Sequence, residues 1–227
     1  MKLILVGCEY SGTTTIAKAI DKWAKFELGT GFRLIHDHFK LPDTQPHGPI
    51  LTNEEIVNWQ NLSPRMVEVI QRHNLYYHTP SESSKKANLL IIGLHIDESI
   101  YGPLYYDYGH KGVSGDRVVI GRHIELNFKK YAPETVLVHV KASQEVIRSR
   151  MQKKPHTHQV IKGKDIEHLL SRFEEEVFNS ILNRIELDTS TSTVQEVVDD
   201  FAEKIVPYLT TEDQLDMLTN RKISLLK

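Results

Sequence analysis

The chain has 227 residues, enough for one well-buried α/β domain with a small inserted lid. Its 28 basic and 30 acidic residues give a formal charge of −2, and this balance argues against nucleic acid or an anionic membrane as a partner. The single cysteine, Cys8, excludes an internal disulfide, and the N-terminal apolar run is too short for a signal peptide. No stretch reaches membrane-spanning length, so we expect a cytoplasmic protein.

The first predicted unit is a strand, a turn and a helix that together bind phosphate. Residues 3–6 form a short apolar strand, and after Thr14 the apolar residues recur at helical spacing. The backbone N–H groups of the turn between them form a concave nest, and the N-terminus of the helix adds partial positive charge. We expect a nucleotide to bind along this loop, which consists of Gly7, Cys8, Glu9, Tyr10, Ser11, Gly12, Thr13 and Thr14.

The loop departs from the usual pattern G-x-x-x-x-G-K-[ST] at one position. Thr13 occupies the lysine position, whereas Thr14 occupies the position of the hydroxyl that holds Mg²⁺. By analogy with the removal of one oxyanion donor, loss of a fixed cation costs about a hundredfold to a thousandfold in rate. Another group must therefore supply positive charge, or the chemistry differs. The alternative interpretation is a turn rich in glycine and threonine that binds no ligand.

The second predicted strand, residues 33–37, ends at Asp37. Ligands of open α/β sheets bind at the carboxyl ends of the strands, so Asp37 is a candidate functional residue. The alternative is that Asp37 only forms the turn before Pro42. A loop rich in proline and glycine follows, and we expect a helical insertion over about residues 53–79, with Asn53 as the cap of its first helix.

The next predicted strand is a central one, because residues 88–94 are almost continuously apolar. The segment 97–110 is rich in tyrosine, and we expect it to break at Gly102-Pro103. Its tyrosines offer a stacking platform for a base, but aromatic residues that follow a central strand are more often core residues. They are Tyr101, Tyr105, Tyr106 and Tyr108.

The C-terminal half alternates regularly between helices and strands. Its predicted elements are a helix at 116–130, a strand at 135–140, helices from Ser143 and Ile166, a strand at 184–188 and a helix from Thr193. Alternation of this kind predicts a three-layer α/β fold, in which a mainly parallel, five-stranded sheet carries helices on both faces. We expect residues 1–209 to form a single domain and residues 210–227 a polar, peripheral tail.

The order of these elements resembles that of the nucleoside and nucleotide kinase families of P-loop proteins, thymidylate kinases especially. Besides the phosphate loop, the resemblance is carried by residues 138–143 before a basic segment, by residues 171–176, and by Leu-Asp-Thr-Ser at 187–190 before a Val-Val helix. Residues 36–42, His-Asp-His-Phe-Lys-Leu-Pro, are also similar to the Asp-Asp-Phe-Phe-Lys-Pro stretch of uridine and nicotinamide riboside kinases. The resemblance covers most of the chain, and the loop is its most specific motif.

The resemblance implies transfer of a phosphoryl group from ATP with the help of Mg²⁺. Asp37 matches the carboxylate that activates the acceptor hydroxyl in those kinases or, with Thr14, holds the metal. The kinases also carry an acidic-basic pair at the end of the third strand. The corresponding residues here are 93–97, so the pair is absent and only His95 and Asp97 remain to contribute. We therefore expect the small-molecule acceptor near the following residues: His38, Phe39, His95, Asp97, Tyr101 and Arg122.

A basic segment over about residues 148–165 lies where the resemblance implies a lid. Its cations are Arg148, Arg150, Lys153, Lys154, Lys162 and Lys164. We expect Arg148 and Arg150 to act as catalytic cations that replace the missing lysine. Two residues this close on a helix do not share a face, so at most one of the arginines points inward. The alternative is a solvated run of charges.

Histidine is frequent, with 12 residues, and two pairs have alternate spacing, His36-x-His38 and His156-x-His158. Such spacing on an extended segment is compatible with half of a Zn²⁺ or Ni²⁺ site, but a complete site needs two further ligands and the sequence shows none arranged for it. We interpret these histidines as hydrogen-bonding groups that take part in base recognition.

Two other function classes stay open. Residues 10–14 are similar to the Lys-Ser-Gly-Thr-Thr loop of sulfotransferases, which use 3′-phosphoadenosine 5′-phosphosulfate, although Tyr10 stands where those enzymes have a basic residue. A non-catalytic nucleotide-binding protein is the third class, with Thr13 as the trace of lost catalysis. The basic lid and the Leu-Asp-Thr-Ser ending favour a phosphotransferase that uses Mg-ATP and a nucleoside, a nucleotide or another small acceptor. The sequence leaves open which acceptor this is and whether the protein forms a homodimer.

Overall fold

The computed structural model describes residues 1–32, 34–38, 51–82, 88–157 and 159–225. Five strands form one sheet in the order β2-β3-β1-β4-β5, and every pair of neighbours is parallel. The strands are β1 (Lys2–Val6), β2 (Leu34–Asp37), β3 (Leu89–Ile92), β4 (Val136–Lys141) and β5 (Asn183–Asp188). The predicted three-layer α/β fold with a parallel, five-stranded sheet is confirmed. Because all strands run the same way, their carboxyl ends meet at one edge of the sheet.

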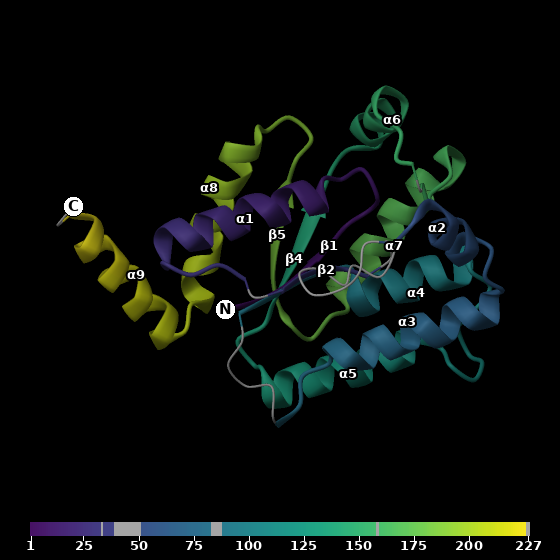
Figure 1. Cartoon of the computed structure of the whole chain (residues 1–227), viewed down its shortest axis with the longest axis horizontal. Coiled ribbons are helices and arrows are strands. Elements are labelled where there is room, and N and C mark those ends of the chain that lie inside the picture. The colour runs from purple at the N-terminus through teal and green to yellow at the C-terminus, as the bar shows by residue number, and fades with distance from the viewer. Residues whose placement is uncertain (33, 39–50, 83–87, 158, 226–227) are drawn as a thin grey trace.

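The helices follow the strands in the order expected for parallel crossovers. They are α1 (Thr13–Glu27), α2 (Asn53–Gln60), α3 (Pro64–His78), α4 (Leu94–Tyr105), α5 (Arg117–Tyr131), α6 (Gln144–Lys153), α7 (Ile166–Phe178), α8 (Val194–Ile205) and α9 (Thr211–Leu225). Figure 1 shows α1 and α8 on one side of the sheet and α4, α5 and α7 on the other. In the part of the chain that the structure describes, no helix is both long and apolar enough to cross a bilayer.

Alternation along β1 divides the core between these two layers. Leu3 and Leu5 belong to the apolar cluster that includes α1 and α8, whereas Ile4 and Val6 belong to the cluster under α4, α5 and α7. Successive side chains of a strand point to opposite faces, so a strand that is apolar at every position must be covered on both. Burial of each such side chain contributes about 1.5–3 kcal/mol, which makes β1 the centre of the fold.

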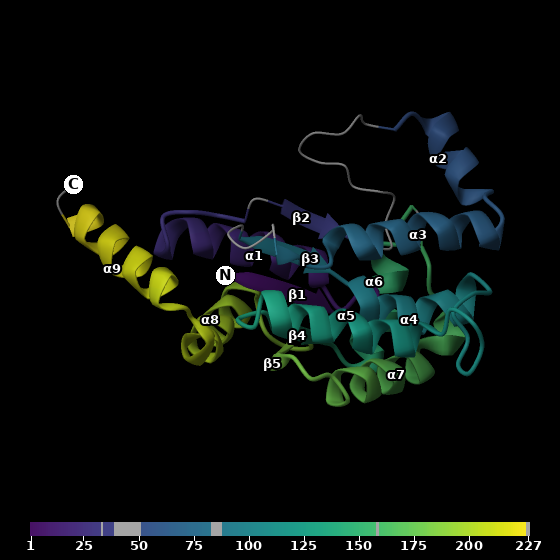
Figure 2. The ribbon, with the colours of Figure 1, turned by 90° about the horizontal axis from the view of Figure 1, so that it is seen from below.

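The helical insertion begins at a capping box, in which the Thr52 side chain accepts from Glu55 N–H and the Glu55 carboxylate accepts from Thr52 N–H. The cap is therefore Thr52 rather than the expected Asn53. Helix α2 buries no residue, while α3 packs on α4 and buries Val67 and Leu75. Figure 2 shows α2 on the outer side of α3, furthest from the sheet. The insertion is thus anchored through α3.

The expected break at Gly102-Pro103 is wrong, because α4 continues through both residues to Tyr105. Proline has no N–H to donate back into the helix, but Pro103 lies in the last turn, where one lost bond costs least. Gly102 has a packing reason to be there. A Cβ at this position would lie 2.8 Å from the Tyr108 ring, so only glycine lets that ring pack against the helix.

The segment expected to be a polar tail forms helix α9. The amino group of Met1 forms an ion pair of 3.0 Å with Asp213, near the start of α9. At its other end, Arg221 pairs with Glu27 of α1 at 3.0 Å. These contacts attach α9 to β1 and α1, at the end of the molecule opposite α2 and α3 (Figure 1).

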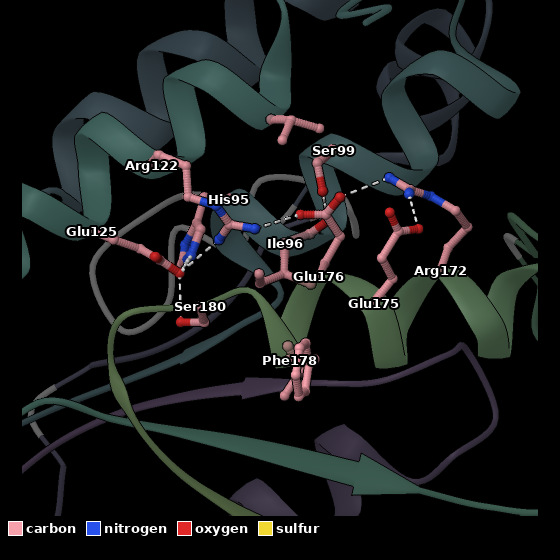
Figure 3. A network of polar contacts seen from close by, with 12 residues as sticks. His95, Ile96, Ser99, Arg122, Glu125, Arg172, Glu175, Glu176, Phe178 and Ser180 are labelled. Carbon is pink, nitrogen blue, oxygen red and sulfur yellow. Dashed lines mark hydrogen bonds and ion pairs between the residues drawn. The ribbon is translucent and has the colours of Figure 1, made fainter.

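A buried polar network joins α4, α5 and the end of α7 (Figure 3). His95 Nε2 lies 2.9 Å from Glu125 Oε1, and the Ser180 hydroxyl donates to the same oxygen at 2.6 Å. Arg122 bridges Glu125 and Glu176, at 3.3 and 3.0 Å. Burial alone would raise the pKa of the Glu125 carboxyl, but the hydrogen bonds and charge of His95, with the bonds from Ser180 and Ile181 N–H, lower it to about 2.

This network generates a prediction about acid stability. The pKa of Glu125 is lower in the folded chain than in the unfolded chain, so its stabilising effect is complete at neutral pH and is lost as the pH falls from about 4.5 to about 2. Glu125→Gln should lower the free energy of unfolding by about 2–4 kcal/mol near pH 7 and by much less near pH 3. Urea titrations at both pH values test this. The exposed Glu203→Gln on α8 is the control, and an equal loss at both pH values would contradict the prediction.

Candidate functional site

The phosphate loop connects β1 to α1 through two residues in the left-handed conformation. Tyr10 has a φ of 71° and Gly12, which caps α1, has a φ of 101°. A left-handed residue between right-handed or extended ones turns successive N–H groups inward, which is the geometry of an anion nest. Ser11 N–H closes the turn on Cys8 O at 2.8 Å. A Cβ on Gly7 would lie 2.3 Å from Val140 O, so this glycine is required by the close packing of the loop on β4.

Arg150 holds the outer side of this loop. Its guanidinium donates to Tyr10 O at 2.9 Å and to Ser11 O at 3.1 Å. It also donates to the Thr189 hydroxyl and carbonyl, at 3.0 and 2.6 Å, so it ties the loop to the end of β5. Arg148, two residues earlier on α6, does not line the cavity at the loop. At most one of the arginines was expected to face inward, and Arg150 is the one that does.

The carboxyl ends of β2 and β3 bring two carboxylates to the loop. Asp37 ends β2, and its Oδ2 accepts a hydrogen bond of 3.0 Å from the Thr14 hydroxyl in the first turn of α1. Asp97 comes from the first turn of α4 and is buried, and its Oδ1 has no hydrogen-bond partner among the described residues. Burial raises the pKa of the Asp97 carboxyl well above its usual range, and the charges of Asp37 and Glu98 raise it further.

The backbone after β3 is bent sharply to present Asp97. Gly93 has a φ of 85°, and the next residue, Leu94, has a φ of 54° although it is not glycine. A non-glycine residue in this conformation costs about 1–2 kcal/mol, and such strain is often found at functional sites. A Cβ on Gly93 would lie 2.3 Å from Asp97 Oδ2. Gly93 therefore leaves room for the carboxylate of Asp97 one turn later.

A second buried network lies beneath these carboxylates. His38 Nε2 is 2.9 Å from Glu98 Oε1, and Arg117 Nε donates to Glu98 Oε2 at 2.7 Å. Arg117 also pairs with Glu68 of α3 at 2.7 Å, which links the insertion to α4 and α5. Burial would raise the pKa of the Glu98 carboxyl, but His38 and Arg117 lower it. His38 is thus part of the core and does not line the cavity.

The loop, the carboxylates and the end of α6 enclose one cavity of about 370 Å³. Its lining is acidic at the ends of β2 and β3, where Asp37 and Asp97 lie, and basic on the side of α6. The basic side consists of Arg150, Lys153, Lys154 and His156. An anionic ligand that lies on the nest would therefore meet cations along one side and carboxylates at its far end.

Of the residues expected from the sequence, ten line this cavity: Gly7, Glu9, Tyr10, Gly12, Thr13, Thr14, Asp37, Asp97, Tyr101 and Arg150. Cys8 and Ser11 belong to the loop but are buried beneath it. Phe39 lies outside the described residues, and so does His158.

Besides His38, two expected acceptor residues do not line the cavity. His95 and Arg122 lie in the network of Figure 3, between α4, α5 and α7, and do not line the cavity. His95 is on α4 like Asp97, but it points to Glu125 on α5 because residues two apart on a helix face different sides. His156 also lines the cavity, although the sequence suggested for it only half of a metal site or a part in base recognition. Its position within a basic segment was the available signal.

Comparison with known proteins supports the fold. No family model matches the sequence, and no curated protein matches it. Among solved structures, the chain is similar to YorR from Bacillus subtilis in complex with phosphorylated GDP, with 18% identity, coverage of 92% of this chain and 99% of that one, and a TM-score of 0.53. It is also similar to deoxyadenosine kinase from M. mycoides with bound dATP, at 14% identity, 90% and 99% coverage and a TM-score of 0.55.

A third similar structure is thymidylate kinase from Candida albicans, with 11% identity, 91% coverage of both chains and a TM-score of 0.50. At such identities the likeness is one of fold. The chain therefore has the fold of the P-loop nucleoside and nucleotide kinases, as the resemblance of its sequence implied.

The environment of Asp97 generates a prediction. Its pKa is raised in the folded chain, so the folded chain binds more protons than the unfolded chain above the ordinary pKa of about 3.8, and wild type gains stability as the pH falls. Asp97→Asn removes this dependence. As the pH falls from about 7 to about 4, the stability of wild type should therefore increase relative to that of the Asn variant.

Thermal melts in the absence of divalent ions measure the difference, with the exposed Asp216→Asn on α9 as the control. If the gap between wild type and Asp97→Asn stays constant or widens in favour of Asn as the pH falls, the assignment of Asp97 as a carboxyl kept neutral by burial is wrong.

Proposed function

We propose that the chain is a phosphotransferase that moves a phosphoryl group from Mg-ATP to a nucleoside, a nucleotide or another small acceptor. The observation that carries the proposal is the meeting of an anion nest with Thr14 and Asp37, whose side chains are 3.0 Å apart, in one cavity. The solved structures of similar fold, one of a deoxyadenosine kinase and one of a thymidylate kinase, support the same class. The cytoplasmic location and the choice of ATP as donor are parts of this proposal.

In this proposal the donor phosphates lie on the backbone N–H groups of residues 7–14. The nest and the N-terminus of α1 then act as fixed dipoles that need no reorganisation as charge moves between oxygens. The carboxylate of Asp37 lies at the edge of the same cavity, where it accepts the proton of the attacking hydroxyl. Asp97, whose pKa is raised by burial, lines the same cavity and donates a hydrogen bond to the acceptor in its protonated form.

The residues at this end fit a magnesium ion. Mg²⁺ prefers oxygen ligands and is usually held by one or two carboxylates together with phosphate oxygens and water. Thr14 and Asp37 supply such oxygen ligands from the protein. When bound, the ion would neutralise charge on the phosphates. The Asp37 carboxylate also argues against a phosphosulfate donor, because a sulfuryl group carried without a metal would meet its negative charge.

Ligand binding gives the direct test. A ligand at a hundred times its dissociation constant stabilises the folded chain by about 2.7 kcal/mol. We therefore expect ATP with Mg²⁺ to raise the melting temperature, and ATP with EDTA to raise it less. The 3′-phosphoadenosine 5′-phosphosulfate nucleotide should have the smallest effect. A larger, metal-independent shift with the phosphosulfate nucleotide would overturn the proposal in favour of a sulfotransferase.

The role of Asp37 is tested by Asp37→Asn. Loss of a general base lowers kcat by about a hundredfold to ten-thousandfold, whereas nucleotide affinity should change only a few-fold. The measurement is ADP formation with a panel of nucleosides and nucleotides, compared with nucleotide affinity by calorimetry. Asp216→Asn on α9 is the matched control, since it changes an exposed aspartate far from the cavity. A variant at Asp37 with near-normal kcat would return this residue to the role of a turn former.

A further inference from the structure

The cavity has no lysine from the loop, so another residue must provide positive charge next to the donor phosphates. Four basic side chains line it, of which the histidine is charged only when protonated: Arg150, Lys153, Lys154 and His156. The contacts of each show how far it is available to a ligand.

Arg150 is largely committed to the protein. Its two terminal nitrogens donate to three backbone carbonyls and one hydroxyl, those of Tyr10, Ser11 and Thr189. These bonds use three of the five N–H groups of the guanidinium, so Arg150 first of all shapes the loop and leaves only Nε–H and one Nη2–H for a phosphate.

The two lysine side chains are exposed to a ligand, but no ion pair in the described part of the chain fixes their position. Lys153 ends α6 and Lys154 follows it, and both side chains are exposed and have no ion pair among the described residues. A lysine side chain has many rotamers, and it loses this conformational entropy when a ligand fixes it. They contribute a diffuse positive field rather than a fixed contact.

His156 is fixed by the loop itself. Its ring stacks on Tyr10, with the ring centres 4.0 Å apart and the planes at 18°. Its backbone N–H donates to the Tyr10 hydroxyl at 2.8 Å, and its Nδ1 lies 2.5 Å from Glu9 Oε1. A ring whose Nδ1 bonds a carboxylate has its tautomer and orientation set, so Nε2 is the nitrogen left for a ligand.

Glu9 is fixed in turn. Its Oε2 accepts from Val160 N–H at 2.9 Å and from Ile161 N–H at 3.1 Å. A carboxylate within a phosphate loop would repel the ligand if its charge were not compensated. Here the imidazole and these two N–H groups compensate it, which gives a physical reason for an acidic residue at this position.

We propose that protonated His156 contacts the outer phosphates of the donor through Nε2–H, in the place of the contact that the missing loop lysine would make, with Glu9 as the residue that positions it. This inference rests on the proposed function and names the group that completes its binding site. It differs from the expectation that Arg148 and Arg150 replace the lysine, because Arg148 does not line the cavity and Arg150 is bound to carbonyls.

A double-mutant cycle between residues 13 and 156 tests the proposal. His156→Gln keeps a hydrogen-bonding group near Glu9 but removes the charge, and it should weaken ATP binding about 10- to 100-fold. Thr13→Lys restores the usual loop. It should recover most of that loss in the His156→Gln background and add little to wild type.

Three further variants serve as controls. His168→Gln on α7 changes an exposed histidine away from the cavity, and Lys153→Gln and Lys154→Gln remove the neighbouring lysines. The first should leave ATP affinity unchanged, and the other two should weaken it less than threefold. Glu9→Gln removes the partner of the ring but keeps the imidazole, so it should weaken ATP binding by less than His156→Gln and by more than the lysine variants. His156→Lys keeps a basic group at position 156 and should not show this loss.

The outcomes separate the inference from the proposed function. If wild type binds no nucleotide under any condition, the proposed function fails. If wild type binds ATP and His156→Gln binds it equally well, only the inference fails. If Thr13→Lys improves binding by the same factor in both backgrounds, His156 acts on the fold of the loop rather than on the phosphates, and the inference is overturned. If His156→Gln lowers the melting temperature, the effect of Thr13→Lys on ATP binding is compared between wild type and the His156→Lys background instead, and that comparison decides between these outcomes.

Discussion

The structure depends on one constraint: a nest of inward-facing N–H groups keeps its shape only while the carbonyls behind it are also bonded. Arg150 meets this requirement, because it bonds the outer carbonyls of the loop and the end of β5 together. The left-handed Tyr10 and Gly12 set the curvature, and the packing of Gly7 on β4 sets the depth. The position of every other group in the cavity is defined relative to this scaffold.

The second determinant is the distribution of charge at the carboxyl edge of the sheet. Acidic groups gather after β2 and β3, and cations gather at the end of α6. Two different environments allow acidic side chains to be buried in this fold. His38 and Arg117 lower the pKa of the Glu98 carboxyl, whereas burial raises the pKa of Asp97, whose Oδ1 has no hydrogen-bond partner among the described residues. The pKa values of two neighbouring carboxyls on one helix are thus shifted in opposite directions.

Much of the fold could be predicted from the sequence, because it rests on local patterns. The loop lies between an apolar run and a helical period, and Asp37 ends a strand, so both could be assigned to the site. The side-chain pairs could not. His38, His95 and Arg122 are bound to Glu98, Glu125 and Glu176, residues far apart in the chain, and no local pattern shows such a choice. The continuation of α4 through Pro103 could not be predicted either, because a helix accommodates proline there only when it ends within the next turn.

Glu9 and Tyr10 serve two purposes at once. Their backbone forms part of the nest, while their side chains hold His156, Gln159 and Val160. In the proposed function, binding of the donor phosphates is therefore linked thermodynamically to the contacts that these side chains make with that segment. Linkage is reciprocal: a substitution that favours these contacts would raise the affinity for the donor by the same factor by which the donor favours the contacts. The affinity of the proposed site would then respond to changes in a segment outside the loop.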